Sequence, residues 1–251
     1  MSIKRGLFRI ANKLYADHYF IYYPLYSAYK AVSDRRERRL LRSLVEPGMI
    51  IVDVGANVGV YSRFFATLTK SGGIVHCFEP SPLNFERLRD NIAHLTNVRS
   101  NQAAVGDRSG TLSLYLSDEL NVDHRAFGGD ELRDSITVQV VSLDDYFAVG
   151  QRVDLIKIDV QGFEMNVLRG AARVLAENQN IVVMMEYWPY GLRKASIEPQ
   201  EPIALLRDLG FEVRTTIDTA TQKFDFTALD PKAIDDDCNL LVSRSNVQPK
   251  P

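Results

Sequence analysis

The chain has 251 residues, of which 45% are hydrophobic and 25% are charged, and its formal net charge is −2. This composition is typical of a globular protein and excludes a low-complexity chain, while the lack of an apolar run of about 18 residues argues against a spanning helix. No signal peptide is visible at residues 1–9, and the two cysteines, Cys77 and Cys238, form no C-x-x-C pair. We therefore expect a cytoplasmic protein with reduced cysteines, and neither a disulfide nor a zinc site.

Residues 1–45 are expected to form a basic, aromatic-rich, helical extension. Residues 1–46 carry a net charge of +6, which leaves −8 for the rest of the chain. Seven aromatic side chains cluster here, namely Tyr15, Tyr19, Phe20, Tyr22, Tyr23, Tyr26 and Tyr29. Either the helices pack these aromatics onto the sheet as a cap, or they contact a membrane surface and place the protein at the inner face of a membrane. Nucleic acid is not an expected partner, because no DNA- or RNA-binding motif accompanies the charge.

Met49 to Val54 is a short, β-branched apolar run that predicts a strand buried on both faces of a parallel sheet. A turn with Gly55 and Gly59 follows, and apolar residues then resume at helical spacing. Such a strand, turn and helix is typical of nucleotide-binding folds, in which glycines let the backbone approach a ligand. The spacing departs from G-x-G-x-x-G at Asn57 and Val60, which argues against a dinucleotide and hence against an NAD-dependent oxidoreductase.

The run Asp53 to Gly59, DVGANVG, resembles the first motif of the class I methyltransferases, which bind S-adenosylmethionine. A carboxylate at Asp53 suits this cofactor, because the cofactor carries an ammonium and a sulfonium group. Ile74 to Phe78 predicts the second strand, and Glu79 follows it, 24 residues after Gly55. That offset is close to the roughly 20 residues at which a carboxylate binds a ribose diol. The alternative for Glu79 is a solvated acid at a strand end.

Ser81 and Pro82 predict a helix N-cap and the first residue of its helix. The pattern then predicts a third strand and its turn at 98–105, an inserted antiparallel pair at 110–116 and 136–141, a fourth strand at 154–159, a helix at 163–176, a fifth strand at 180–186, a helix at 201–209, and a closing antiparallel hairpin at 211–217 and 239–242. Together these predict an α/β fold with a doubly wound, mostly parallel, seven-stranded Rossmann-like sheet and a C-terminal antiparallel hairpin. Residues 46–245 are expected to form this one domain, and residues 246–251 a disordered tail.

Five blocks of sequence carry a resemblance to a known family. They are VDVGANVGVYS (52–62), FEPSP (78–82), AVGDRSG (104–110), VSLDDY (141–146) and DLIKIDVQGFEMNVLRGA (154–171). On these motifs the chain resembles the FkbM family of S-adenosylmethionine-dependent methyltransferases, and the last block is the most specific. One departure is Gln161, where members of the family most often have Glu, which argues that a carboxylate is not strictly needed there.

The resemblance implies an O-methyltransferase that transfers a methyl group from S-adenosylmethionine to a hydroxyl of a sugar, glycolipid, polysaccharide or secondary metabolite. The residues expected to bind the cofactor are Asp53, Gly55, Ala56, Asn57, Gly59, Glu79, Pro80, Ala104 and Asp159. A non-catalytic S-adenosylmethionine-binding module would be expected to show damage at Asp53, Gly55, Glu79 or Asp159, and none of these positions is damaged. The expected partner is a small-molecule or glycan acceptor, and the oligomeric state stays open.

Three residues are candidates for catalysis. Asp159 ends the fourth strand, where open α/β sheets bind ligands, and is the first candidate for the base that takes the acceptor's proton. Glu186 ends the fifth strand and could act as a second acid or join Asp159 around a divalent cation, although a metal is not the favoured interpretation. His124 lies in the insert 117–135, whose paired glycines predict either a lid over the acceptor or an ordinary surface loop.

Tyr187, Trp188 and Tyr190 form an aromatic cluster just beyond the fifth strand. Such a cluster either stacks on the apolar face of a carbohydrate acceptor or packs in the core with its polar tips in water. The histidine of the second strand, His76, is expected to be structural.

Overall fold

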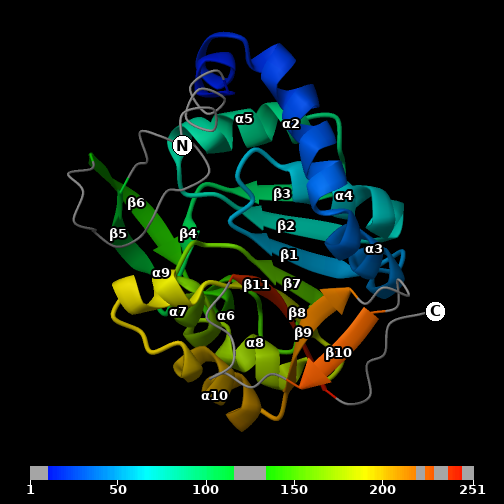
Figure 1. Cartoon of the computed structure of the whole chain (residues 1–251), viewed down its shortest axis with the longest axis vertical. Coiled ribbons are helices and arrows are strands. Elements are labelled where there is room, and N and C mark those ends of the chain that lie inside the picture. Colours follow the sequence, from blue (N-terminus) through cyan, green and yellow to red (C-terminus); the bar gives the residue numbers. More distant parts are fainter. Residues whose placement is uncertain (1–10, 116–133, 219–223, 229–236, 245–251) are drawn as a thin grey trace.

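The computed structural model describes residues 11–115, 134–218, 224–228 and 237–244. An eight-stranded sheet forms the centre of the molecule, helices cover both of its faces, and a small three-stranded sheet lies at its side (Figure 1). The strand order of the large sheet is β10-β9-β11-β8-β7-β1-β2-β3. The predicted doubly wound α/β fold is therefore confirmed.

The large sheet contains all seven strands that the sequence predicts, and β10 adds an eighth at its end. Its strands are β1 (Ile50–Val54), β2 (Ile74–Phe78), β3 (Val98–Asn101), β7 (Leu155–Ile158), β8 (Val182–Tyr187), β9 (Glu212–Asp218), β10 (Phe224–Ala228) and β11 (Cys238–Ser243). Neighbouring strands from β3 to β8 are parallel, whereas β11 is antiparallel to both β8 and β9. The carboxyl ends of β1, β2, β7 and β8 therefore meet at one edge of the sheet.

The predicted third strand and its turn, 98–105, contribute to both sheets. Its first part, β3, pairs with β2, whereas β4 (Ala104–Val105) pairs with β6 (Ser135–Val141). Because β2 ends at Phe78, the chain beyond β3 has no neighbouring strand with which to continue the ladder. β5 (Gly110–Tyr115) runs antiparallel to β6, as the alternating pattern predicted.

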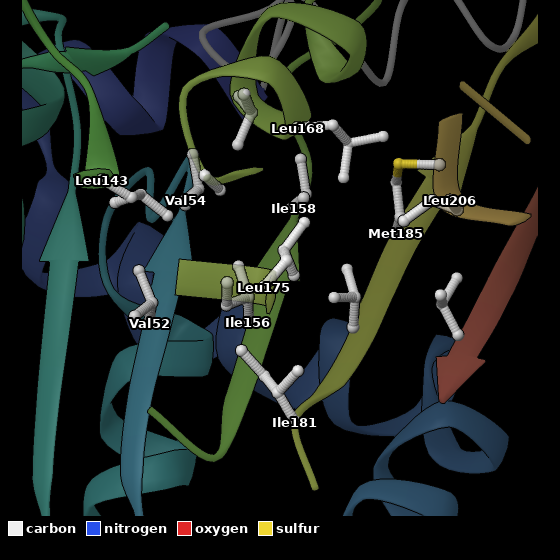
Figure 2. Packing of buried hydrophobic residues seen from close by; sticks show 14 of the residues in the cluster. Val52, Val54, Leu143, Ile156, Ile158, Leu168, Leu175, Ile181, Met185 and Leu206 are labelled. Atoms are coloured by element: carbon white, nitrogen blue, oxygen red, sulfur yellow. The ribbon is translucent and has the colours of Figure 1, made fainter. Parts of the chain in front are cut away.

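The helices form two layers, one on each face of the large sheet. One face is covered by α3 (Arg35–Leu44), α4 (Val60–Thr69) and α5 (Pro82–Ile92), with the short 3₁₀ helix Lys70–Gly72 after α4. The other is covered by α6 (Leu143–Tyr146), α7 (Glu164–Arg169), α8 (Ala172–Glu177), α9 (Pro189–Lys194) and α10 (Gln200–Asp208). Figure 2 shows the packing on this second face, where Val52 of β1 and Ile156 of β7 lie close to Leu175 of α8. These two layers exclude water from the strands that position the site.

One long helix was predicted at 163–176, and the structure contains two short ones, α7 and α8. A β-carbon at Gly170 would lie 1.9 Å from the carbonyl oxygen of Gly106, so the backbone between the helices is in direct contact with the loop after β4. The Asp144 carboxylate then accepts hydrogen bonds from the backbone N–H groups of Arg173 and Val174, both at 2.9 Å. This side chain satisfies the first donors of a new helix, which explains why α8 begins separately.

The N-terminal extension is helical where it is described, with a helix at 11–17, then α2 (Tyr19–Ser33) and α3. Five of its seven clustered aromatics, Tyr15, Tyr19, Tyr22, Tyr23 and Tyr26, pack with Val58 and Val60, while Phe20 and Tyr29 are exposed. The guanidinium groups of Arg38 and Arg42 lie over the Phe64 ring, at 4.8 and 5.1 Å from its centroid. No helix in the described part of the chain combines the length and apolar character needed to cross a membrane.

Candidate active site

A cavity of about 370 Å³ lies at the carboxyl ends of β1, β2, β7 and β8. This volume is in the range of small-molecule sites, roughly 300–1,000 Å³. The cavity brings together most of the residues expected to bind the cofactor or to act in catalysis, namely Asp53, Gly55, Ala56, Asn57, Glu79, Pro80, Ala104, Asp159 and Glu186. Gly59 does not line it, and His124 lies outside the described residues.

The turn after β1 passes closely under the cavity. Gly55 has a φ of +80°, and a β-carbon there would lie 1.9 Å from the carbonyl oxygen of Asp159, so no other residue fits without moving the backbone. Its N–H and that of Ala56 donate to the carbonyl of Phe78 at 3.1 and 2.9 Å. Gly59 also has a left-handed φ, +85°, and a β-carbon there would lie 2.6 Å from a methyl carbon of Leu88. Gly59 thus permits α4 to pack against α5.

Asp53 is a fully buried carboxyl group at the floor of the cavity. Its Oδ2 accepts a hydrogen bond from the Ser62 hydroxyl at 2.7 Å, while Oδ1 has no partner. Burial raises the pKa of Asp53, an effect that the nearby Lys157 ammonium opposes. A buried acceptor without a partner is costly, so this oxygen is suited to a ligand that brings a donor such as an ammonium group.

Glu79 lies beside the turn, and its two carboxylate oxygens hold backbone groups on either side of the cavity. Oε2 accepts from the N–H of Asn57 and Oε1 from the N–H of Ser81, both at 2.9 Å. Glu79 is only 5% exposed, so it is not a solvated acid at a strand end. Burial raises its pKa to about 7, although these two hydrogen bonds oppose the shift. The side chain of Asn84 donates a third hydrogen bond to this carboxylate, which leaves one acceptor position for a hydroxyl donor from the cavity.

Two side chains that the sequence did not assign to the site, Lys157 and Gln161, bind Asp159, and Gln161 also joins it to Glu186. Lys157 donates from Nζ to Oδ2 of Asp159 at 3.0 Å, and Gln161 donates from Nε2 to Oδ1 of Asp159 at 3.3 Å and to Oε2 of Glu186 at 2.7 Å. The sequence could have indicated the role of Lys157, since a lysine between two isoleucines of a buried strand needs a charged partner. The sequence spacing did not indicate the role of Gln161, because this side chain reaches both acids from a left-handed backbone conformation with φ +52°.

The environment drives the pKa values of the two acids apart. Burial would raise the pKa of Asp159, but the adjacent Lys157 ammonium outweighs this and lowers it. Burial and the neighbouring Asp159 and Glu164 raise the pKa of Glu186 to about 9. Burial would lower the pKa of Lys157, but its acidic neighbours raise it. At neutral pH the cluster therefore contains an ionised Asp159, a charged Lys157 and a protonated Glu186, which separates the base from the acid.

The wall of the cavity opposite the strands comes from the N-terminal extension. Tyr26 and Lys30 of α2 line it together with Tyr61 of α4. Lys30 forms an ion pair with Asp34 at 2.6 Å, and the Tyr61 hydroxyl donates to the same carboxylate at 3.0 Å. Sequence reasoning did not place these side chains at the site, because an aromatic, basic helix does not reveal which surface its inner face covers.

Similarity to known proteins identifies the family of this chain. A family model described as "Methyltransferase FkbM domain" matches residues 53–213. The chain belongs to this family. Its relatives include 2-O-methyltransferase NoeI of Sinorhizobium fredii, which is 29% identical over 72% of this chain and 79% of that protein. The 31-O-demethyl-FK506 methyltransferase FkbM of Streptomyces tacrolimicus is 32% identical over 53% of this chain and 64% of that protein. Hexuronic acid methyltransferase AglP of Haloferax volcanii is 25% identical over 71% and 70%.

The protein is thus an S-adenosylmethionine-dependent methyltransferase, as the sequence motifs implied, and not an oxidoreductase. In this FkbM-family enzyme, neither the histidine of β2 nor the aromatic cluster at the end of β8 lines the cavity. His76 contacts the Tyr146 hydroxyl at 2.8 Å, and burial lowers its pKa to about 4, so it is a neutral structural residue. Tyr187 is fully buried, Trp188 packs against Gly191, and Tyr190 is exposed, so these three do not form a sugar platform in the cavity. Among the described residues, no group of three or more His, Cys, Asp or Glu side chains gathers in a way that could hold a metal ion.

The buried acids of this FkbM-family enzyme make its stability depend on pH. The pKa values of Glu164 and Glu186 are raised by burial to about 7 and about 9. A carboxyl group with a raised folded-state pKa stabilises the fold fully below its unfolded value, near 4.3, and this contribution is lost as pH rises through the folded value. We expect the free energy of unfolding to fall between about pH 5 and 9. In Glu186→Gln, the decrease in this free energy above about pH 7 is expected to be smaller by roughly 1–3 kcal/mol.

Glu164→Gln is the matched control for this prediction. Glu164 is 1% exposed and does not line the cavity, and its lower pKa confines its contribution to the range below about pH 7. Denaturant unfolding at several pH values measures both effects. The same pH slope in Glu186→Gln and in the wild type would show that Glu186 is not protonated in the folded protein.

Proposed function

We propose that this enzyme transfers the methyl group of S-adenosylmethionine to a hydroxyl oxygen of a sugar, glycolipid, polysaccharide or secondary metabolite. The observation that carries the proposal is an ionised carboxylate, Asp159, paired with a buried lysine in a cavity that is also lined by the residues proposed to bind the cofactor. The relatives support transfer to oxygen, since two have names that specify an O-methyl position and a third is named for hexuronic acid.

The residues present fit the cofactor in three respects. The unpartnered Oδ1 of Asp53 suits an ammonium group, the acceptor position left on the Glu79 carboxylate suits a ribose hydroxyl, and the missing β-carbon of Gly55 lets the turn beneath the cavity lie against the carbonyl of Asp159. When bound, S-adenosylmethionine supplies a methyl group on a positively charged sulfur, which is already activated as an electrophile. The protein therefore has to orient the acceptor and accept one proton.

Asp159 is the proposed base. As the acceptor oxygen bonds to the methyl carbon, its O–H proton moves to a carboxylate oxygen of Asp159, and the electron pair of the broken C–S bond stays on sulfur. Lys157 keeps Asp159 ionised before the reaction, and Gln161 fixes the direction of its carboxylate. Glu186, protonated at neutral pH, supplies a donor that orients the acceptor. His124 stays an alternative base.

Glu79→Ala is expected to weaken S-adenosylmethionine binding by roughly 1.5–3 kcal/mol, which is more than tenfold. The loss combines the hydrogen bonds proposed for the ribose with those that hold the Asn57 and Ser81 backbone in place. Isothermal titration calorimetry measures the affinity, and Glu164→Gln serves as the control because Glu164 is equally buried but does not line the cavity. Unchanged affinity in Glu79→Ala would contradict the assignment of Glu79 to the cofactor site. Binding of NAD in place of S-adenosylmethionine would contradict it as well.

We also propose that the enzyme acts in the cytoplasm, at the inner face of a membrane. It is supported by the charge distribution, since residues 1–46 carry +6 and the remainder −8. An anionic lipid surface attracts such a basic segment.

A further inference from the structure

The outer face of α2 is apolar and exposed. Among the described residues, five of the large hydrophobic side chains that are exposed belong to this one helix, namely Phe20 (75% exposed), Ile21 (41%), Leu25 (59%), Tyr29 (65%) and Val32 (70%). The spacing of Ile21, Leu25, Tyr29 and Val32 places these four on one face of a helix. We call these four residues the α2 stripe, and Phe20 lies beside it. The helix itself runs along the outside of the molecule (Figure 1).

The opposite face of α2 is firmly attached to the enzyme. The Tyr19 hydroxyl accepts a hydrogen bond from Asn91 at 2.7 Å, and the Tyr23 hydroxyl accepts one from Arg63 at 3.2 Å. On the same side, Tyr26 and Lys30 line the cavity. The helix therefore has an inner face fixed on the active site and an outer face with no partner in the described chain, so the α2 stripe is not free to turn inward.

Charge indicates what the α2 stripe contacts. Between Tyr19 and Ser33 the helix has no acidic residue and a single charged one, Lys30. Before it lie the exposed side chains of Lys13 and Asp17, after it those of Arg35 and Arg36, and residues 1–10 add Lys4, Arg5 and Arg9 with no acid. Two copies docked through this face would bring two segments of +6 together, which opposes a dimer. A negatively charged lipid surface complements both the apolar stripe and its basic ends.

We propose that α2 is a membrane-surface helix, with the α2 stripe inserted between the headgroups of an anionic bilayer and the basic residues paired with its phosphates. The helix lies parallel to the surface, since it is too short to cross it. The cavity wall formed by Tyr26 and Lys30 then lies one helix diameter, about 10 Å, from the lipid. This inference concerns docking alone and does not depend on which hydroxyl is methylated.

The test uses the full chain and co-sedimentation with vesicles of phosphatidylcholine, with and without phosphatidylserine. The wild type is expected to bind the anionic vesicles, and binding is expected to fall at least tenfold in about 0.5 M salt, where charges are screened within a few ångströms. The double variant Leu25→Ser/Val32→Ser is also expected to lose at least tenfold. Both side chains are exposed, so this variant keeps its fold, which an unchanged affinity for S-adenosylmethionine verifies.

The matched control is Leu83→Ser/Val149→Ser, which removes two exposed hydrophobic side chains elsewhere on the surface. It is expected to bind vesicles like the wild type. Three results would overturn the proposal: no binding of the wild type to anionic vesicles, equal binding by the two double variants, or a wild-type dimer in sedimentation that Leu25→Ser/Val32→Ser dissociates. The last result would assign the α2 stripe to a second copy of the chain. None of these outcomes bears on methyl transfer, which is measured separately.

Discussion

Asp159→Asn is expected to lower methyl transfer by about 10²–10⁴, the usual contribution of a positioned general base. Asparagine keeps the shape of the side chain and its contact with Gln161 but cannot accept the proton. The substitution also removes the partner of Lys157, which is 5% exposed, so we expect a lower melting temperature as well. Turnover at saturating S-adenosylmethionine, the affinity for S-adenosylmethionine and the melting temperature separate these effects.

Glu186→Gln is the matched control for this experiment, because it makes the same acid-to-amide change on the neighbouring strand. Since Glu186 is protonated at neutral pH, its amide analogue is expected to keep turnover within a few fold of the wild type. If Asp159→Asn instead weakens cofactor binding and leaves saturated turnover unchanged, Asp159 belongs to the cofactor site and His124 becomes the leading base. Full activity in the presence of a chelator would end the divalent-cation alternative.

The half of the cavity that we propose for the cofactor could be located from the sequence because its residues are encoded locally. A buried strand, a glycine turn and an acid after the next strand have fixed positions in a parallel sheet, so Asp53, Gly55 and Glu79 converge once the strands are identified. What the sequence did not show is that the two oxygens of Glu79 already hold backbone N–H groups. Those bonds depend on the course of two turns, which periodicity does not describe.

The acceptor half could be predicted only in part, because it is built from distant contacts. Asp159 and Glu186 were placed correctly at the ends of neighbouring strands, but the bridge through Gln161 requires a positive φ that propensity does not favour for glutamine. The wall formed by Tyr26 and Lys30 depends on where α2 lies relative to the sheet. Hydrophobic periodicity shows which face of a helix is buried and not which partner covers it.

A chain that starts at Glu46 is expected to be insoluble or unfolded. It lacks four side chains of α3 and the residue after it, Leu40, Leu41, Leu44 and Val45, which pack in one cluster with residues of β1 and α4. Each buried side chain of this size contributes roughly 1.5–3 kcal/mol, so the loss is about 6–12 kcal/mol, comparable to the whole stability of a typical domain. Soluble expression and a thermal melt measure the result, and a soluble chain with the wild-type melting temperature would contradict it.

A second truncation, starting at Asp34, separates stability from function. It keeps the three leucines of α3, Val45 and the hydrogen bond from Tyr61 to Asp34, but it removes Tyr26 and Lys30 from the cavity wall. We expect this chain to fold and to bind S-adenosylmethionine, since Asp53, Gly55 and Glu79 remain, while methyl transfer falls at least tenfold because one side of the acceptor space is open to water. Wild-type transfer by this truncated chain would show that α2 takes no part in holding the acceptor, and the role of the extension would then reduce to the leucines of α3.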